Sequence, residues 1–389
     1  MRKIYYICNI VITNLKTLEN MNSKRLYSLD ALRGFDMFFI MGLSGLIAAL
    51  CALAPNAFTD AIALQMKHVA WDGLRHHDTI FPLFLFLAGV SFPFSMAKSQ
   101  EMGASKGQIY LKIVRRGVML ILLGMVYNGL LRLEFDTLRC ASVLGRIGLA
   151  WMVAALLYVS CGVKVRAALS VAILVGYALL SKYVGAPDVE GADPLSMQGS
   201  LVGYIDRLFM PGKLIYDGGR FDPEGLLSAL PAVVTAMLGI FTGELIRLPE
   251  ERVSGNRKSL YMVLGAVVLA LVAVAAKGFV PINKMLWSST FVCAVGAYSL
   301  ALMALFYYII DVRGWRGWTL PFRVVGMNSI TIYLAQRIIN FSGISNFFFG
   351  GVAGLCSESW AAVVNSAGYV LVCWLFLYFL YRKQVFLKI

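Results

Sequence analysis

Residues 68–86 read His68-Val-Ala-Trp71-Asp72-Gly73-Leu-Arg-His-His-Asp78-Thr-Ile-Phe81-Pro82-Leu-Phe84-Leu-Phe86, and this stretch decides the fold class. An imidazole and a carboxylate, ten residues apart, stand directly before an apolar run long enough to enter a bilayer. The order predicts proton-transfer chemistry at a membrane boundary. Such chemistry suits a pump, a carrier or a membrane-embedded transferase.

The composition supports a polytopic membrane protein. Of 389 residues, 59% are hydrophobic and 14% are charged, and the mean hydropathy is +0.73. A soluble chain carries about 25% charged residues. The net charge of +14 does not indicate nucleic acid, because the basic residues form short segments between apolar runs. Seven cysteines lack CxxC or Cys/His spacing, so we expect neither a disulfide framework nor a metal site.

The apolar runs predict an all-α fold of about ten transmembrane helices, since a helix needs about 20 apolar residues to cross the bilayer core. The short segments on the side of the termini hold 23 Lys and Arg, against 11 on the other side. The positive-inside rule therefore places both termini in the cytoplasm and His68, Asp78 and the loop 185–224 outside. Residues 343–356 are expected to be re-entrant or interfacial. The predicted spans are 30–53, 78–97, 111–131, 142–160, 166–184, 225–246, 259–276, 287–310, 322–341 and 358–381.

The N-terminal segment, residues 1–22, contains an apolar run that is too short to span a membrane and has no cleavage site after it. We expect this leader to lie outside the native protein, which would then start at Met21. Residues 23–389 are expected to form a single transmembrane domain.

His68 and Asp78 are the first candidates for catalysis. Ten residues of continuous helix would separate them by about 15 Å. The Trp71-Asp72-Gly73 turn signal predicts a bend that brings them together. A carboxylate can then fix the imidazole tautomer for general acid–base work. The alternative is an interfacial histidine that only bonds a loop, and His76 and His77 fit that description.

Other polar residues fall into two groups, each with a plainer alternative. Those near the cytoplasmic side or within spans could hold phosphates or a polar cofactor, or could be anchors and contacts between helices; they are Arg33, Arg146, Asn328 and Ser329. Arg33 is also one helical turn from Asp30 and is expected to pair with it. Those on the outer side could bind a sugar, or could be helix caps and interfacial aromatics; they are Trp71, Glu224, Asn283, Lys284 and Trp287.

Five ordered motifs between residues 26 and 341 resemble the heparan-alpha-glucosaminide N-acetyltransferase family, especially its bacterial relatives, also labelled N-acetylglucosamine-related transporters. They are Ser-Leu-Asp30-Ala-Leu-Arg33-Gly34, His68-x-x-Trp71-x-Gly73-x4-Asp78-x-x-Phe81-Pro82, Asp222-Pro223-Glu224-Gly225, Pro281-x-Asn283-Lys284-x-Leu-Trp287 and Gly326-Met-Asn328-Ser329.

The resemblance implies transfer of acetyl from cytoplasmic acetyl-CoA to the amine of a glucosamine across the membrane, with His68 as the active histidine and Asp78 as its partner. It also implies a homodimer in a bacterial inner membrane. Ser44 stands where the lysosomal enzymes carry an assisting Asn. Their large lumenal domain and additional span are not found in this sequence, so we expect a bacterial-type amino sugar as acceptor.

The sequence therefore predicts a membrane acetyltransferase in which His68 acts as a base or carries the acetyl group. Two other functions remain open: a proton-coupled amino-sugar transporter and a polysaccharide O-acetyltransferase.

Overall fold

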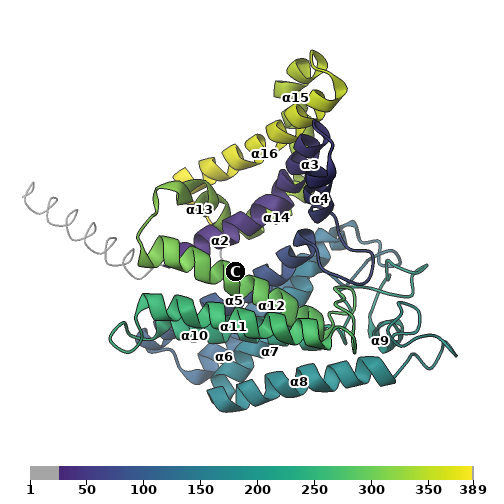
Figure 1. Ribbon diagram of the computed structural model, residues 1–389, viewed down its shortest axis with the longest axis vertical. Coiled ribbons are helices and arrows are strands. Elements are labelled where there is room, and N and C mark those ends of the chain that lie inside the picture. The colour runs from purple at the N-terminus through teal and green to yellow at the C-terminus, as the bar shows by residue number, and fades with distance from the viewer. Residues whose placement is uncertain (1–25, 388–389) are drawn as a thin grey trace, which may run out of the picture.

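The computed structural model describes residues 26–387, and this part of the chain is almost wholly helical (Figure 1). The leader, residues 1–22, lies outside the described residues. Within residues 26–387 the backbone forms no sheet, only isolated bridges in the outer loops. The all-α polytopic membrane fold predicted from the sequence is confirmed.

Within residues 26–387, eight helical segments are long and apolar enough to cross a membrane, and each overlaps a predicted span. The first, Tyr27–Ala52, consists of α2 (Tyr27–Phe38), a π-helical turn η1 (Phe39–Leu43) with a kink at Gly42, and α3 (Ser44–Ala52). The others are α5 (His76–Glu101), α7 (Val143–Ser160), α8 (Val163–Tyr183), α10 (Ala229–Arg247), α11 (Gly255–Ala276), α12 with η3 (Ser289–Tyr307 and Tyr308–Val312) and α16 (Glu358–Arg382).

Two predicted spans differ from the prediction. The segment expected at 111–131 is α6 (Lys106–Tyr127), which is long enough but carries Lys112, Arg115 and Arg116. The segment expected at 322–341 is broken into α13 (Leu320–Gly326) and α14 (Ser329–Ile338), because the chain leaves the helix at Asn328. The Gly-rich piece expected at 343–356 is α15 (Phe341–Gly354).

α5 lies at the centre of the bundle. It packs most closely against α10 and also contacts α2, α7 and α12. Its apolar residues cover all sides of the helix, which is the pattern of a helix buried all round. The end of the bundle that the positive-inside rule predicts to face outward, called the outer end below, carries α3, α4 (Ala57–Gln65) and α15 at the upper right of Figure 1 and α9 (Leu201–Phe209) at the lower right, and α8 and α16 lie at opposite edges. The start of α5 is therefore held at the outer end of the bundle.

The motif Gly326-Met-Asn328-Ser329 has a packing role that the sequence did not indicate. α13 crosses α2 so closely that a Cβ at Gly326 would lie 1.9 Å from the carbonyl oxygen of Asp30. A Cβ at Gly34 would lie 1.7 Å from the carbonyl oxygen of Phe322. Small residues allow such approaches between membrane helices. This crossing places Asn328 beside α2.

Gly326→Ala is expected to lower the stability of the protein, because the added methyl group must push α13 from α2. Overpacking of this kind costs about 1–3 kcal/mol. Gly176→Ala is the matched control, since nothing lies within 4 Å of a Cβ at Gly176 in α8. Thermal unfolding followed by fluorescence measures both variants. Equal melting temperatures for the two would contradict the packing role.

Candidate active site

His68 and Asp78 form the polar centre at the outer end. Nδ1 of His68 lies 2.7 Å from Oδ1 of Asp78. The predicted bend is confirmed: His68 lies in the loop after α4, and Asp78 lies in the first turn of α5. The imidazole is half exposed (54%), whereas the carboxylate is buried (2%). The pair therefore has an accessible ring held by a buried anion.

The backbone fixes the Asp78 carboxylate. Its Oδ2 accepts hydrogen bonds from the backbone N–H groups of Val69, at 3.1 Å, and Arg75, at 3.3 Å. The Arg75 side chain donates to the carbonyl oxygen of His68, at 2.8 Å. Asp78 thus caps the start of α5 and closes the bend with one side chain. The position of His68 depends on this cap.

Lys284 is the third member of this cluster. Its Nζ lies 3.1 Å from Nδ1 of His68 and 3.4 Å from Oδ1 of Asp78. Nδ1 cannot donate to the carboxylate and accept from an ammonium at once. Nδ1 lies closer to Asp78 than to Lys284, which favours a proton on Nδ1 that is donated to the carboxylate. Nε2 is then the free base, and Lys284 pairs with Asp78. Lys284, which the sequence grouped with sugar-binding residues, contacts the catalytic candidates themselves.

Lys284 gives a pH-dependent contribution to stability. Burial lowers its pKa from 10.5, against the attraction of Asp78. The unfolded chain then holds this proton to higher pH than the folded protein, so stability rises with pH from the lowered pKa towards 10.5. We expect the melting temperature of the wild type to rise relative to Lys284→Met over this window. The exposed Lys277, changed to Met, is the control. A difference between wild type and Lys284→Met that stays constant with pH would refute this.

His77 extends the cluster towards α3. Its ring centroid lies 4.5 Å from that of His68, and its Nδ1 lies 3.2 Å from Oγ of Ser44. Ser44 therefore contacts His77, and through it lies beside the His68 ring. His76 points elsewhere and packs against Phe39 and Tyr298.

Asn283 and Trp287 lie in the same loop as Lys284. Asn283 is buried; its Oδ1 accepts from the backbone N–H of Leu286, at 2.8 Å, and its Nδ2 has no hydrogen-bond partner among residues 26–387. The indole of Trp287 is also buried, against Phe81. Trp71 donates from its indole to the carbonyl oxygen of Leu195, at 3.0 Å. Asn283 thus fixes its own loop, Trp287 packs into the core of the bundle, and Trp71 joins two loops, so all three have structural partners.

Glu224 is engaged by a cation that the sequence analysis missed. Arg139 makes a bidentate contact with Asp222, at 2.7 and 2.8 Å, and also pairs with Glu224. The expectation that Asp222 and Glu224 start a membrane helix is wrong, because α10 begins only at Ala229. Two carboxylates that are two residues apart at a membrane boundary are expected to pair with a cation. That rule predicts a basic partner for Asp222 and Glu224, although it does not say that the partner is Arg139.

Arg146 lies in the same outer region. Its guanidinium stacks over Trp287, 4.9 Å from the ring centroid, and contacts Ser228 and the carbonyl oxygen of Gly225. The structure therefore separates Arg146 from Arg33, although the sequence grouped them as cofactor-binding residues. Its partners give it a structural role at the start of α10.

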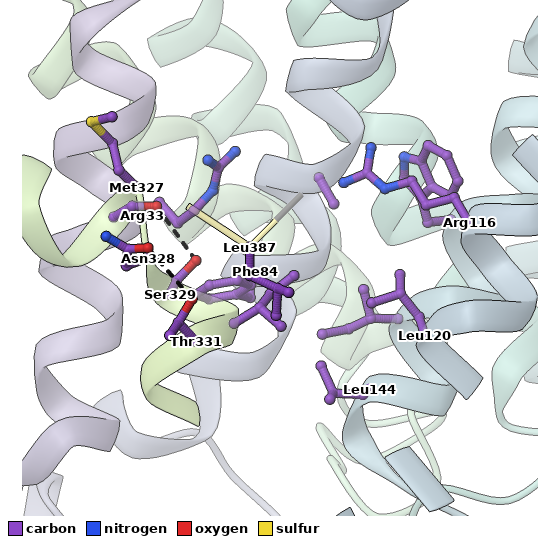
Figure 2. A pocket seen from close by; sticks show the side chains of 15 residues that line it. Arg33, Phe84, Arg116, Leu120, Leu144, Met327, Asn328, Ser329, Thr331 and Leu387 are labelled. Atoms are coloured by element: carbon purple, nitrogen blue, oxygen red, sulfur yellow. Dashed lines mark hydrogen bonds between the residues drawn. The ribbon is translucent and has the colours of Figure 1, made fainter. Parts of the chain in front are cut away.

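The remaining predicted cofactor-binding residues meet in a cavity of about 240 Å³ inside the bundle, which extends from Arg33 in α2 to Leu144 near the start of α7 (Figure 2). Arg33, Asn328 and Ser329 lie on one side of this cavity, and Arg116 faces them from α6. Arg33 pairs with Asp30 at 3.6 Å, as predicted. Arg116 stacks over the Trp151 ring at 4.5 Å, and its Nε has no hydrogen-bond partner among residues 26–387.

Two further cavities extend this one in opposite directions. On the α6 side, about 660 Å³ is lined in part by Lys112 and Arg115, and this space shares Arg116 and Trp151 with the first cavity. In the other direction, about 40 Å³ continues past Phe84 to Phe81 and shares Phe84 and Ser329 with it. Phe81 is three residues from Asp78, or about 5 Å along α5. Leu387, in the C-terminal tail, lines the first two cavities (Figure 2).

The cavities thus form a row with three properties. The wide end is basic, the middle holds the hydrogen-bonding groups of Asn328 and Ser329, and the narrow end is apolar and lies one helical turn from Asp78. Guanidinium groups suit phosphates, and a narrow apolar channel suits a thin flexible chain. From the sequence, Arg115 and Arg116 are cytoplasmic-side cations that topology explains or that could hold cofactor phosphates, and the choice stays open because their distance from Arg33 depends on how α6 packs.

Comparison with known proteins gives two findings. Residues 25–179 match the model of a domain of unknown function, DUF5009. The chain is also similar to heparan-alpha-glucosaminide N-acetyltransferase from Homo sapiens, with 28% identity over 380 residues, and from Mus musculus, with 27% identity over 375 residues. Each alignment covers 83% of this chain and 56% of the relative, so the chain spans about half the length of these relatives.

Proposed function

Because this chain is homologous to the heparan-alpha-glucosaminide N-acetyltransferases, we propose that it is a transmembrane acetyltransferase. It takes acetyl from acetyl-CoA on the cytoplasmic side and passes it to the amine of a glucosamine-type sugar outside. The row of cavities that ends one helical turn from the His68–Asp78 pair carries this proposal. In keeping with the resemblance, we place the protein, as a homodimer, in a bacterial inner membrane.

The basic end suits the phosphates of CoA. Arg33 and Arg116 face each other across the cavity, and Lys112 and Arg115 line the adjoining space. Arg binds phosphate oxygens through paired N–H groups. Asn328 and Ser329 offer an amide and a hydroxyl to the amide groups of the pantetheine arm. The thioester would then follow the apolar channel towards Phe81.

His68 performs the proton transfer. The amine of an amino sugar must lose a proton before it can attack a thioester, and Nε2 of His68 is the free base when Nδ1 donates to Asp78. The attacking nitrogen forms a bond to the acetyl carbon, the bond from carbon to sulfur breaks, and CoA leaves as the thiol after taking one proton. Asp78 stabilises the imidazolium formed in between. A second route, with acetyl carried on His68, uses the same contacts.

The lining of the narrow cavity argues against sugar transport along the same path. Its walls near Asp78 are the aromatic side chains of Phe81, Phe84 and Tyr333. Such walls offer few hydrogen bonds to the hydroxyl groups of a sugar, whereas they suit the apolar parts of a thioester arm. This favours the acetyltransferase over the proton-coupled carrier.

Proteoliposomes that enclose glucosamine and receive labelled acetyl-CoA outside test the proposal. We expect labelled N-acetylglucosamine inside, without entry of free acetyl-CoA. Release of the enclosed glucosamine in unmodified form would instead identify a carrier. Label transferred to a sugar whose amine is blocked would identify an O-acetyltransferase. Either of these results, without N-acetylation, overturns the proposed reaction.

A further inference from the structure

A second polar cavity lies on the far side of α3 from the candidate active site. It measures about 460 Å³ and opens between η1, α3, α15 and α16. None of its lining residues carries a charge, and none lines the row of cavities described above. They are Gly42, Gly45, Ser342, Ser345, Asn346, Asn365, Ser366 and Tyr369.

The amides of this cavity have no hydrogen-bond partners among residues 26–387. The side chains of Asn346 and Asn365 are exposed, and neither makes a hydrogen bond to any residue in the described part of the chain. Asn365 is seven residues into α16, about 10 Å from the outer end of a helix that crosses the membrane. Amide groups without partners at this depth are costly, and polar residues there mark functional sites. These amides are therefore available to a ligand.

The surface beside the cavity is apolar. Ser342, Ser345 and Asn346 recur at helical spacing on one face of α15. Phe347 and Phe348, on the neighbouring face, are 82% and 65% exposed. A ligand in the cavity would thus have lipid and aromatic rings beside it. This arrangement suits a polar group attached to a hydrocarbon chain.

The lining also restricts the charge of the ligand. Amide and hydroxyl groups both donate and accept, as sugar hydroxyls require, and no Lys or Arg is present for a phosphate. Tyr369 supplies an aromatic wall: a Cβ at Gly42 would lie 3.0 Å from its ring, and its hydroxyl accepts from Nε2 of Gln336, at 2.8 Å. Gly42 has a φ of +126°, which favours glycine, and it permits this close approach.

We propose that this cavity binds an uncharged, hydroxyl-rich sugar group, such as the headgroup of a membrane glycolipid. The site is separate from the His68–Asp78 pair. Ser44, between Gly42 and Gly45, points the other way and contacts His77, so the two sites share only the wall formed by residues 39–45. The proposal does not depend on the acetyltransferase reaction.

Binding to the full chain in amphipol, free of sugar detergents, tests this site. The probes are octyl glucoside below its micellar concentration, methyl glucoside without a chain, and octyl phosphocholine with the same chain and a charged head. Native mass spectrometry and titration calorimetry measure binding. We expect saturable binding of one octyl glucoside per chain and none of octyl phosphocholine. Binding of methyl glucoside as well identifies free sugar as a source; binding of octyl glucoside alone identifies a lipid headgroup.

The double variant Asn346→Leu/Asn365→Leu is expected to weaken octyl glucoside binding at least about 10-fold, through two lost amide partners. Leucine suits a lipid-exposed position, and unchanged thermal unfolding checks the fold. Ser359→Ala, at an exposed position at the start of α16 outside the cavity, is the control. His68→Ala should bind as the wild type does, which separates this site from catalysis. Unchanged binding by the double variant, or equal binding of octyl phosphocholine, overturns the proposal.

Discussion

His68→Ala is expected to lower the rate of acetyl transfer by about 10²- to 10⁴-fold, the usual contribution of a positioned general base, or more if His68 carries the acetyl group. CoA affinity should stay unchanged, because His68 lines neither the cavity of Arg33 and Arg116 nor the adjoining cavity of Lys112 and Arg115. Product formation in proteoliposomes and CoA titration measure the two quantities. His76→Gln is the matched control, since the His76 ring packs against Phe39 and Tyr298 rather than Asp78.

Asp78→Asn separates orientation from charge at the same site. The amide keeps the shape of the carboxylate but can donate to Nδ1 of His68, which moves the ring proton to Nε2 and removes the free base. We expect a loss of about 10²-fold or more in rate with CoA affinity retained. Turnover within a few-fold of the wild type in both His68→Ala and Asp78→Asn would refute the catalytic assignment.

Arg33→Gln and Arg116→Gln are expected to weaken CoA binding by about 10-fold or more each. Hydrogen bonds to charged groups contribute about 1.5–3 kcal/mol, and about 1.4 kcal/mol corresponds to a tenfold change in affinity. Arg257→Gln is the control, because Arg257 is exposed at the start of α11 and does not line the cavities. Calorimetry with CoA and with dephospho-CoA measures the effect. Equal affinities for all three variants would remove these arginines from the proposed cofactor site.

The local part of the candidate site was predictable from the sequence. His68 and Asp78 are ten residues apart, and the residues between them contain the turn signal Trp71-Asp72-Gly73. Their contact therefore follows from short-range geometry. The Asp30–Arg33 pair, one helical turn apart, was predictable for the same reason. The start of α10 could not be predicted from the sequence. Asp222 and Glu224, which precede it, bind Arg139, and this residue lies more than 80 positions earlier in the chain.

The amino-acid sequence by itself determined the membrane class, most of the helices and the histidine–carboxylate pair, because hydropathy and turn formation act over a few consecutive residues. Only the tertiary structure decided that Arg116 faces Arg33, that Arg146 stacks over Trp287, and that Asn346 and Asn365 share a cavity. Those placements depend on how each helix is rotated against its neighbours. That rotation is set by side-chain packing between distant segments, such as the close crossing of α2 and α13 at Gly326.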